Sequence, residues 1–357
     1  MLGLGLTHMA LRLVRYLDVS VKKDEPTTDT SIDSGISHEQ YGDHHGVEGH
    51  IECLPRPVDR HAPRAVAFRY LYNYDEASLG TNPREVIPES DVQNGGPFSG
   101  IVRVVANFQG STGKWWQTTG SGVVVDDYHV MTVGHNVWSS KGGLALSINI
   151  YRDARVDPSD LDERCVDSGA VHYQWAQACS KAKESRCYRK SWKNDFAILR
   201  VSRPFPEGIK RMKYRKTPTN TIRAKIYGFP TDMPNDPAGR WLAHLCYSHS
   251  MVKYASTTNS LLDHDGDTGP GSSGGPIVDS TGKVIALHRG CDWRDSYSHP
   301  LINKAVALFT KGNDPEKFIQ AINFTTREGL VRGTRSGVRQ GVVFRVGDCV
   351  ATYYDWD

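Results

Sequence analysis

The sequence lacks the features that mark several broad classes of protein. No apolar run is long enough to cross a bilayer, which argues against a membrane protein. The formal net charge is only +3, with both signs mixed along the chain, and this is too weak to indicate a nucleic-acid surface. We therefore expect neither a membrane nor a nucleic acid as partner, and we expect a monomer.

Metal and cofactor patterns are also missing. The seven cysteines include no Cys-x-x-Cys pair and no zinc-finger spacing, so no metal site and no cofactor is predicted. Cys165, Cys179 and Cys187 fall in one loop-like stretch, where a disulfide bond is expected if the compartment is oxidising. The odd number of cysteines leaves at least one thiol unpaired.

The N-terminal part shows no clear secretory signal and no regular structure. Charged and polar residues (His8, Arg12 and Arg15) interrupt its apolar stretch, and no clean cleavage site follows. This leaves the compartment open, with secretion favoured. Residues 1–84 are predicted to be a leader, flexible from about residue 20, because that part is polar and lacks sustained periodicity.

After residue 99 the chain is rich in short apolar runs separated by turn residues. Such a pattern predicts an all-β protein with barrels or a sandwich. Asn313-Asp314-Pro315 is typical of a helix start, and predicts a helix through Ala321. The predicted strands are 100–108, 121–125, 129–133, 144–151, 196–201, 224–227, 241–246 and 284–288.

Three local patterns contain residues that could act together in acyl transfer. They are centred on His135, Asp195 and Ser273, in that order along the chain. A serine hydroxyl needs a base to take its proton, and a histidine needs a carboxylate to hold its tautomer and stabilise the imidazolium. The glycine-rich loop 269–275 can supply the backbone N–H groups of Gly271 and Ser273 to a developing oxyanion.

These motifs resemble those of the chymotrypsin-like serine peptidases. "TVGHNVW" resembles the family's histidine block, "NDFAILRV" its aspartate block and "GSSGGPIV" its serine block, with compatible order and spacing. The resemblance covers about residues 85–325. It implies two packed six-stranded antiparallel Greek-key β-barrels, divided near residues 203–220 and followed by a C-terminal helix, with the triad in the cleft between them. Residues 326–357 are a C-terminal extension to which we assign no role.

Two departures narrow the resemblance. No cysteine adjoins His135, and Ser272 stands where trypsin has an aspartate that pairs with the new N-terminal amine on activation. The chain is more similar to the V8-like glutamyl endopeptidases. Residues 84–91 resemble the mature start of that branch, which implies that the leader is a propeptide removed around Arg84 to Val86 and that the chain is made as a zymogen.

The resemblance also implies a specificity pocket. In the glutamyl branch, the positions of Thr268 and His288 hold the substrate carboxylate, and both side chains can donate hydrogen bonds to one. The alternative is Asp267, at the position where trypsin binds a cation, which would predict cleavage after Arg or Lys. A catalytically idle binding module on the same scaffold is the third possibility. For an active enzyme the predicted partners are polypeptide substrates.

Overall fold

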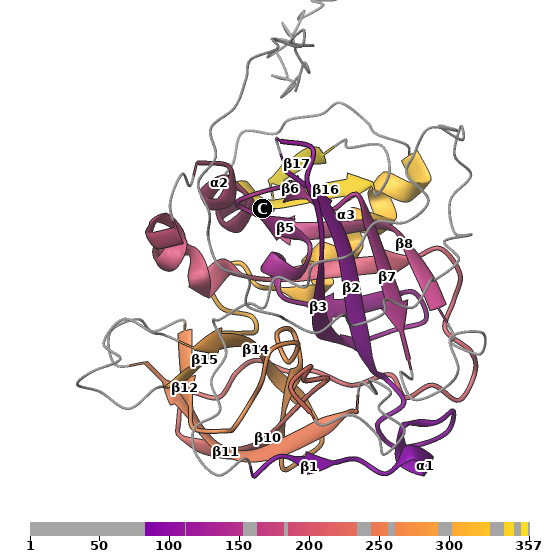
Figure 1. The fold of residues 1–357 in the computed structure, drawn as a ribbon, viewed down its shortest axis with the longest axis vertical. Helices are drawn as coiled ribbons and strands as arrows, with labels where there is room; N and C mark the ends of the chain where they lie inside the picture. Colours follow the sequence, from indigo (N-terminus) through magenta and orange to yellow (C-terminus); the bar gives the residue numbers. More distant parts are fainter. Residues whose placement is uncertain are drawn as a thin grey trace, which may run out of the picture.

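Two closed antiparallel β-barrels form most of the molecule. The computed structural model describes residues 83–110, 112–152, 163–181, 185–233, 244–255, 261–291, 302–328, 339–345 and 351–355. Figure 1 shows the barrels one above the other, with the earlier strands in the upper barrel and the later ones in the lower. The predicted fold class is confirmed. The predicted leader, apart from Pro83 and Arg84, lies outside the described residues.

The first barrel has six strands in the order β8-β7-β2-β3-β4-β9, and it closes because β8 also pairs with β9. These strands are rich in β-branched and aromatic residues, which suit a pleated and half-buried surface. All six strands contribute apolar side chains, among them Val104, Ile150 and Leu199, to one buried hydrophobic cluster. The strands are β2 (Ile101–Gln109), β3 (Trp115–Val124), β4 (His129–Thr132), β7 (Ser147–Tyr151), β8 (Glu163–His172) and β9 (Ala197–Val201).

The second barrel repeats this arrangement in the order β11-β10-β13-β14-β15-β12, closed by the pairing of β11 with β12. Short β1 (Glu85–Val86) adds to its outside by pairing with β11, and α1 (Glu89–Val92) follows it along the lower barrel (Figure 1). The strands are β10 (Ile222–Gly228), β11 (Cys246–Tyr254), β12 (Leu261–His264), β13 (Pro276–Asp279), β14 (Val284–Cys291) and β15 (Asn303–Ala307).

The barrels share a hydrophobic cluster at their junction. It includes Ile101 and Met131 of the first barrel, Phe229 and Leu287 of the second, and Phe318 of the C-terminal helix α3 (Pro315–Glu328). Interiors pack closely, so a shared cluster fixes one barrel against the other. Loops from the two barrels can therefore meet in a defined geometry.

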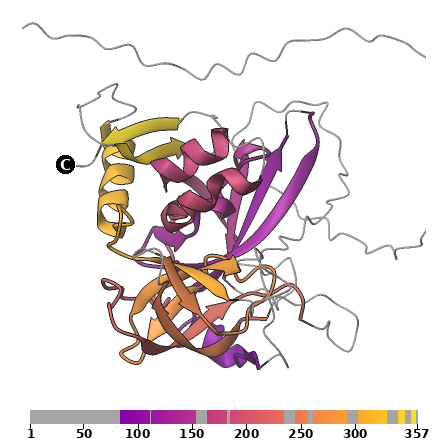
Figure 2. The ribbon, with the colours of Figure 1, turned by 90° about the vertical axis from the view of Figure 1, so that its left-hand side faces the viewer.

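Helical segments and a C-terminal hairpin decorate the first barrel. Helix α2 (Tyr173–Lys181) and the 3₁₀ segment η3 (Ser185–Asn194) are inserted between β8 and β9, and β5 (Trp138–Ser139) pairs with β6 (Gly143–Leu144). Figure 2 shows α3 beside the barrel and α2 with η3 in front of it. In the part of the chain that the structure describes, no helix is long and apolar enough to span a membrane.

The structure corrects several sequence-based boundaries. Of the strand predicted at 241–246, residues 241–243 lie outside the described residues, and of the remaining three only Cys246 belongs to a strand, β11. The strand predicted at 144–151 is broken, because β6 ends at Leu144 and β7 begins at Ser147. The helix predicted to end at Ala321 continues to Glu328. Beyond it, β16 (Arg339–Arg345) pairs with β8 and β17 (Ala351–Asp355) pairs with β16, so residues after 325 extend the sheet of the first barrel.

Candidate active site

His135 and Asp195 are brought together by the pairing of two strands of the first barrel. β4 and β9 are paired up to Thr132 and Ala197, so both candidate residues lie at the same end of the sheet. His135 lies just beyond β4 in the single 3₁₀ turn η1 (Gly134–Asn136), and Asp195 lies just before β9. The register of an antiparallel pair therefore places residues 60 positions apart side by side.

The Asp195 carboxylate receives two hydrogen bonds from His135. The ring Nδ1 of His135 is 2.7 Å from Oδ2, and its backbone N–H donates to Oδ1 at 2.8 Å. Asp195 is fully buried, while the His135 side chain keeps 15% of its surface exposed. A carboxylate bound to Nδ1–H leaves the lone pair of the neutral ring on Nε2. This is the tautomer that a general base requires.

Ser273 comes from the second barrel but is tied to the first. Its backbone carbonyl accepts hydrogen bonds from the Ser121 N–H at 2.7 Å and from Nδ2 of Asn136 at 2.9 Å. Asn136 directly follows His135, so this bond couples the serine loop to the turn that carries the histidine. The Ser273 hydroxyl donates to the backbone carbonyl of Arg289 at 3.0 Å. The structure thus brings the loops of all three predicted residues to one seam between the barrels.

The glycines of the serine loop are required by its geometry. Gly271 has a φ of 98°, and a Cβ at this position would lie 2.5 Å from the carbonyl oxygen of Phe229. Its own carbonyl accepts a hydrogen bond from the Ser121 hydroxyl at 2.8 Å. Its N–H makes no hydrogen bond among the described residues. The loop therefore holds a backbone donor of the kind that an oxyanion hole uses.

The predicted pocket residues Thr268 and His288 are both buried. Thr268 precedes the serine loop, and its hydroxyl has no hydrogen-bond partner within the described part of the chain. His288 lies on β14, where its backbone N–H donates to Gly275 and its carbonyl accepts from Gly274. Backbone bonds therefore join His288 directly to the serine loop.

A second histidine supports His288. Nε2 of His264 lies 2.9 Å from Nδ1 of His288, while Nε2 of His288 has no hydrogen-bond partner in the described residues. Burial lowers the pKa of His264 to about 3, and it lowers the pKa of His288 well below its ordinary value, to which the charge on His264 adds. Both rings are therefore neutral at neutral pH. Sequence reasoning missed His264, because nothing in its local pattern marks it.

Asp267, the alternative specificity residue, is engaged by the chain itself. It is buried, and its Oδ2 lies 3.7 Å from Nε of Arg84. The same guanidinium makes a two-pronged contact with Asp232, at 2.6 and 3.0 Å. The Arg84 side chain is only 5% exposed. Sequence analysis identified Arg84 only as part of a predicted processing site, and nothing in its local sequence indicated its contacts with Asp232 and Asp267.

Further neighbours of the candidate triad come from the inserted helices. The Trp175 ring of α2 lies 6.2 Å from the His135 ring, and its Nε1 donates to the Trp138 carbonyl at 3.1 Å. A Cβ on Gly134 would lie 2.6 Å from the Trp175 ring. In the cysteine stretch, Cys165 is disulfide-bonded and Cys179 is a free thiol. Among the described residues no cluster of three or more metal-ligating side chains occurs.

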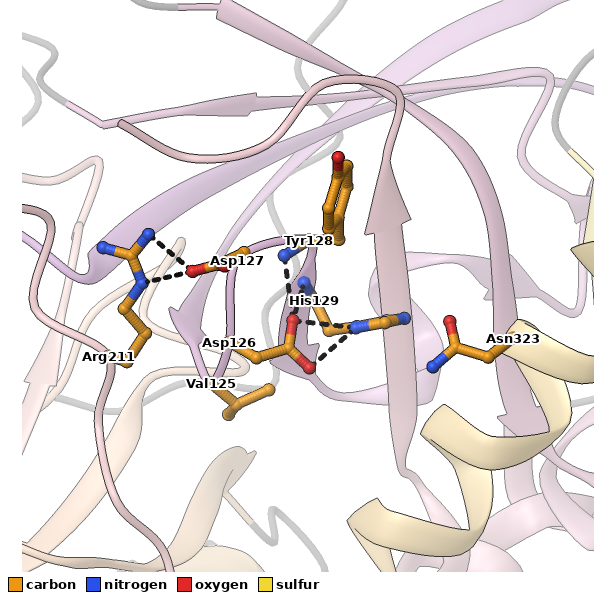
Figure 3. A pocket seen from close by; sticks show the side chains of 7 residues that line it. All are labelled: Val125, Asp126, Asp127, Tyr128, His129, Arg211 and Asn323. Atoms are coloured by element: carbon orange, nitrogen blue, oxygen red, sulfur yellow. Dashed lines mark hydrogen bonds and ion pairs between the residues drawn. The ribbon is translucent and has the colours of Figure 1, made fainter. Parts of the chain in front are cut away.

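A shallow pocket of about 420 Å³ lies away from these residues. Figure 3 shows the His129 ring between Asp126 and Asn323, and Nδ1 of the ring lies 2.8 Å from both Asp126 carboxylate oxygens. Arg211 pairs with Asp127 beside it. None of the predicted site residues lines this pocket.

Comparison with known proteins relates this geometry to a family. Residues 120–287 match the model of the trypsin-like peptidase domain. Among solved structures, a Glu endopeptidase is similar with a TM-score of 0.51 and 16% identity, over 70% of this chain and 99% of that one. No curated protein gave a match.

Two further solved structures match less well. The protease Anisep from Arthrobacter nicotinovorans has a TM-score of 0.43 and 14% identity, over 58% of this chain and 89% of that one. An inactivated protease paralogue from the scabies mite has a TM-score of 0.45 and 16% identity, over 68% of this chain and all of that one (100%).

Proposed function

The chain carries a trypsin-like peptidase domain and is a serine endopeptidase, and from that premise we propose that Ser273 is its nucleophile, His135 its general base and Asp195 the residue that orients His135. The observation that carries this proposal is the pair of hydrogen bonds from His135 to one fully buried carboxylate. They fix the ring in the tautomer that can take a proton at Nε2.

The proposed reaction has two steps. Ser273 Oγ forms a bond to the scissile carbonyl carbon while its proton passes to Nε2 of His135, and the imidazolium then gives that proton to the leaving amine as the C–N bond breaks. Water hydrolyses the acyl-enzyme by the same proton transfers in reverse. The N–H groups of Gly271 and Ser273 stabilise the oxyanion of each tetrahedral intermediate.

The first step requires the Ser273 hydroxyl to change partner. Its proton now points to the Arg289 carbonyl at 3.0 Å. A rotation about χ1 carries the Ser273 oxygen from one staggered position to another, and such rotamer changes are fast compared with turnover.

An organophosphorus fluoride tests the proposal directly. The chain freed of the predicted propeptide should be labelled at Ser273, and labelling should disappear in Ser273→Ala and fall sharply in His135→Gln. Labelling at a different residue, or neither labelling nor peptide cleavage by the folded chain after the predicted propeptide is removed, would favour the idle binding module.

We further propose that the enzyme prefers Glu or Asp before the scissile bond. Thr268 Oγ1 and His288 Nε2 are buried polar atoms that lack a partner in the described residues, and leaving such a group unpaired costs about 1–3 kcal/mol. A substrate carboxylate could satisfy both. When His264 donates from Nε2 to Nδ1 of His288, the neutral His288 ring carries its proton on Nε2 and can donate it.

The contacts of Asp267 argue against the alternative preference for Arg or Lys. A substrate cation would have to compete for a carboxylate that already faces the Arg84 guanidinium. That competition would occur at a side chain with 2% of its surface exposed. The charge that would select a basic side chain is thus compensated within the chain.

A mixed peptide library separates the two preferences. We expect cleavage after Glu and Asp, and predominant cleavage after Arg or Lys would replace this proposal. Thr268→Val keeps the side-chain shape but removes the donor, and should lower kcat/KM for Glu substrates by about 10–100-fold, since a hydrogen bond to a charged group contributes about 1.5–3 kcal/mol. Thr268→Ser, which keeps the hydroxyl, is the matched control and should stay within a few-fold of the original.

A further inference from the structure

A buried arginine meets the carboxylate that His135 uses. Arg289 lies on β14 directly after His288, and only 3% of its side chain is exposed. Its Nε lies 3.3 Å from Oδ2 of Asp195, the same oxygen that lies 2.7 Å from Nδ1 of His135. One carboxylate oxygen thus faces both an imidazole and a guanidinium.

The guanidinium is held in place by the inserted helical segment. Its Cζ lies 3.8 Å above the ring of Trp192, and the backbone carbonyl of Trp192 accepts a hydrogen bond from the Asp195 N–H at 3.1 Å. Arginine stays protonated in proteins, so this charge is permanent. Burying it is expensive unless a carboxylate and an aromatic face compensate. Arg289, Asp195 and Trp192 therefore form one interdependent group.

The backbone of Arg289 contacts the candidate nucleophile, since its carbonyl accepts the hydrogen bond of the Ser273 hydroxyl. The residue therefore contacts the nucleophile through its main chain and the orienting carboxylate through its side chain. Local sequence gave no signal of this, because "Leu287-His288-Arg289-Gly290" reads only as a strand that ends in a glycine.

We propose that Arg289 is a positioning residue that shares the Asp195 charge with His135 and thereby extends activity to lower pH. A fixed positive charge beside Asp195 reduces the stabilisation that the carboxylate gives to an imidazolium. The inference rests on the proposed function, because it assumes that His135 is the base.

Among the described residues, His288 and Cys179 are two further titratable groups near the pair, and both are neutral. On β14, burial lowers the pKa of His288 well below its ordinary value, and the charges of His135 and Arg289 add to this. On α2, burial raises the pKa of the Cys179 thiol, and the charge on Asp195 adds to it. Asp195 at the start of β9 and Arg289 on β14 therefore supply the charges that act on His135 from these elements.

The test replaces the charge and reads the pH dependence in the full chain. Arg289→Met keeps the aliphatic length but removes the charge, and should move the acid limb of kcat/KM upward by about one pH unit, which is about a tenfold loss of rate below the limb. Arg289→Lys keeps the charge and should leave the limb within a few tenths of a unit of the original. A limb that does not move in Arg289→Met, with only the plateau reduced, would overturn the proposal.

A second measurement does not depend on turnover. In a Ser273→Ala background, the proton NMR signal of the His135 ring reports the pH at which His135 becomes protonated, and the Arg289→Met change should raise that pH by the same amount. If Arg289→Met does not fold, Arg289→Gln removes the charge with a polar side chain and is expected to give the same shift. An unshifted signal in a folded variant contradicts the role of Arg289, whereas absence of Ser273 labelling in the chain with its own Arg289, freed of the predicted propeptide, contradicts the proposed function instead.

Discussion

Among the described residues, Arg289 and Arg84 have largely buried side chains that face aspartates near the serine loop, and they differ in what they join. Arg289 contacts Asp195 at 3.3 Å through Nε, and that carboxylate is fully buried and already bound to His135. Arg84 binds Asp232 with two prongs, at 2.6 and 3.0 Å, and Asp232 keeps 34% of its side chain exposed. The first pair includes a residue of the candidate triad, whereas the second holds an N-terminal segment beside the serine loop.

This difference shows that the setting of an ion pair decides its role. A carboxylate that serves two partners changes the charge that each of them feels, so Arg289 can affect a proton transfer. A carboxylate that serves one guanidinium at a partly exposed position mainly fixes two segments of chain. Removing the shared carboxylate should therefore have the largest effect, and removing the clamp at Arg84 the smallest.

Asp195→Asn should break the first pair at its centre. The amide cannot hold the correct tautomer of His135, so we expect kcat to fall by about 10⁴-fold. It also leaves the Arg289 charge buried without its carboxylate, which should lower the free energy of unfolding by about 3–5 kcal/mol. Peptide hydrolysis and urea unfolding measure the two effects.

The matched control is Asp232→Asn, in the second pair. It should leave kcat within about tenfold of the original, because Asp232 contacts neither His135 nor Ser273 in the described structure. Equal losses of activity in the two variants would contradict the distinction between the pairs.

The pH dependence of stability should be separable from the pH dependence of rate. Burial lowers the pKa of His172 to about 4, so the folded chain keeps this ring neutral while the unfolded chain protonates it near pH 6.5. The unfolded state binds more protons between these values, and stability is therefore lost as the pH falls from about 6.5 to about 4. At about 1.4 kcal/mol per pH unit, His172 contributes roughly 3 kcal/mol to this loss.

His172→Gln should reduce that slope in urea titrations between pH 7 and pH 4 by the share of one histidine, because the buried His264 and His288 contribute to it in the same sense. The exposed His249→Gln is the surface control. This comparison matters for Arg289, because a shift of the acid limb reports the charge on Asp195 only while the chain stays folded. A slope that His172→Gln does not change would mean that another group controls acid unfolding.

Sequence reasoning reached the fold and the three candidate residues because the relevant signals are local. A strand followed by Gly134 and His135, or a serine among glycines, can be recognised from a few neighbours. Thr268 and His288 were predicted as a pair by resemblance, and the structure shows only that each is buried with an unpartnered polar atom. The role of Thr268 and His288 in substrate binding stays a prediction, and so do the roles of the three candidate residues in catalysis.

What the sequence did not disclose depends on contacts between distant segments. Arg289 on β14 of the second barrel meets Trp192 on η3, which is inserted between two strands of the first barrel. Arg84 meets Asp232 across 148 residues. Helix α2 and η3 were missed because they are short, and the late strands β16 and β17 because β16 pairs with β8, far upstream, and β17 pairs only with β16 among the described strands. Charge, aromatic character and strand propensity were visible in each case, but the partner was not.

Arg84→Met should test the second pair, and we expect the smallest effect from it. The guanidinium packs against the serine loop, since a Cβ on Gly269 would lie 2.3 Å from its Nη1. Segment 231–232 also holds the loop, because the Thr231 N–H donates to the Pro270 carbonyl. Loosening this region should slow organophosphorus labelling of Ser273 by about tenfold and lower the free energy of unfolding by about 1–3 kcal/mol. The acid limb should not move, unlike that of Arg289→Met.

Trimming the chain extends the same test to the predicted propeptide. A chain that begins at Glu85 lacks Arg84 and its contact with Asp232, so it should be labelled as slowly as Arg84→Met. A chain that begins at Pro83 keeps this contact and should be labelled faster. Arg84→Lys, which keeps the charge but loses the two-pronged contact, should fall between them. If the chain beginning at Glu85 were instead the fastest to be labelled, Arg84 would act as a restraint that processing removes. The proposal that the Arg84–Asp232 contact supports the serine loop would then be wrong.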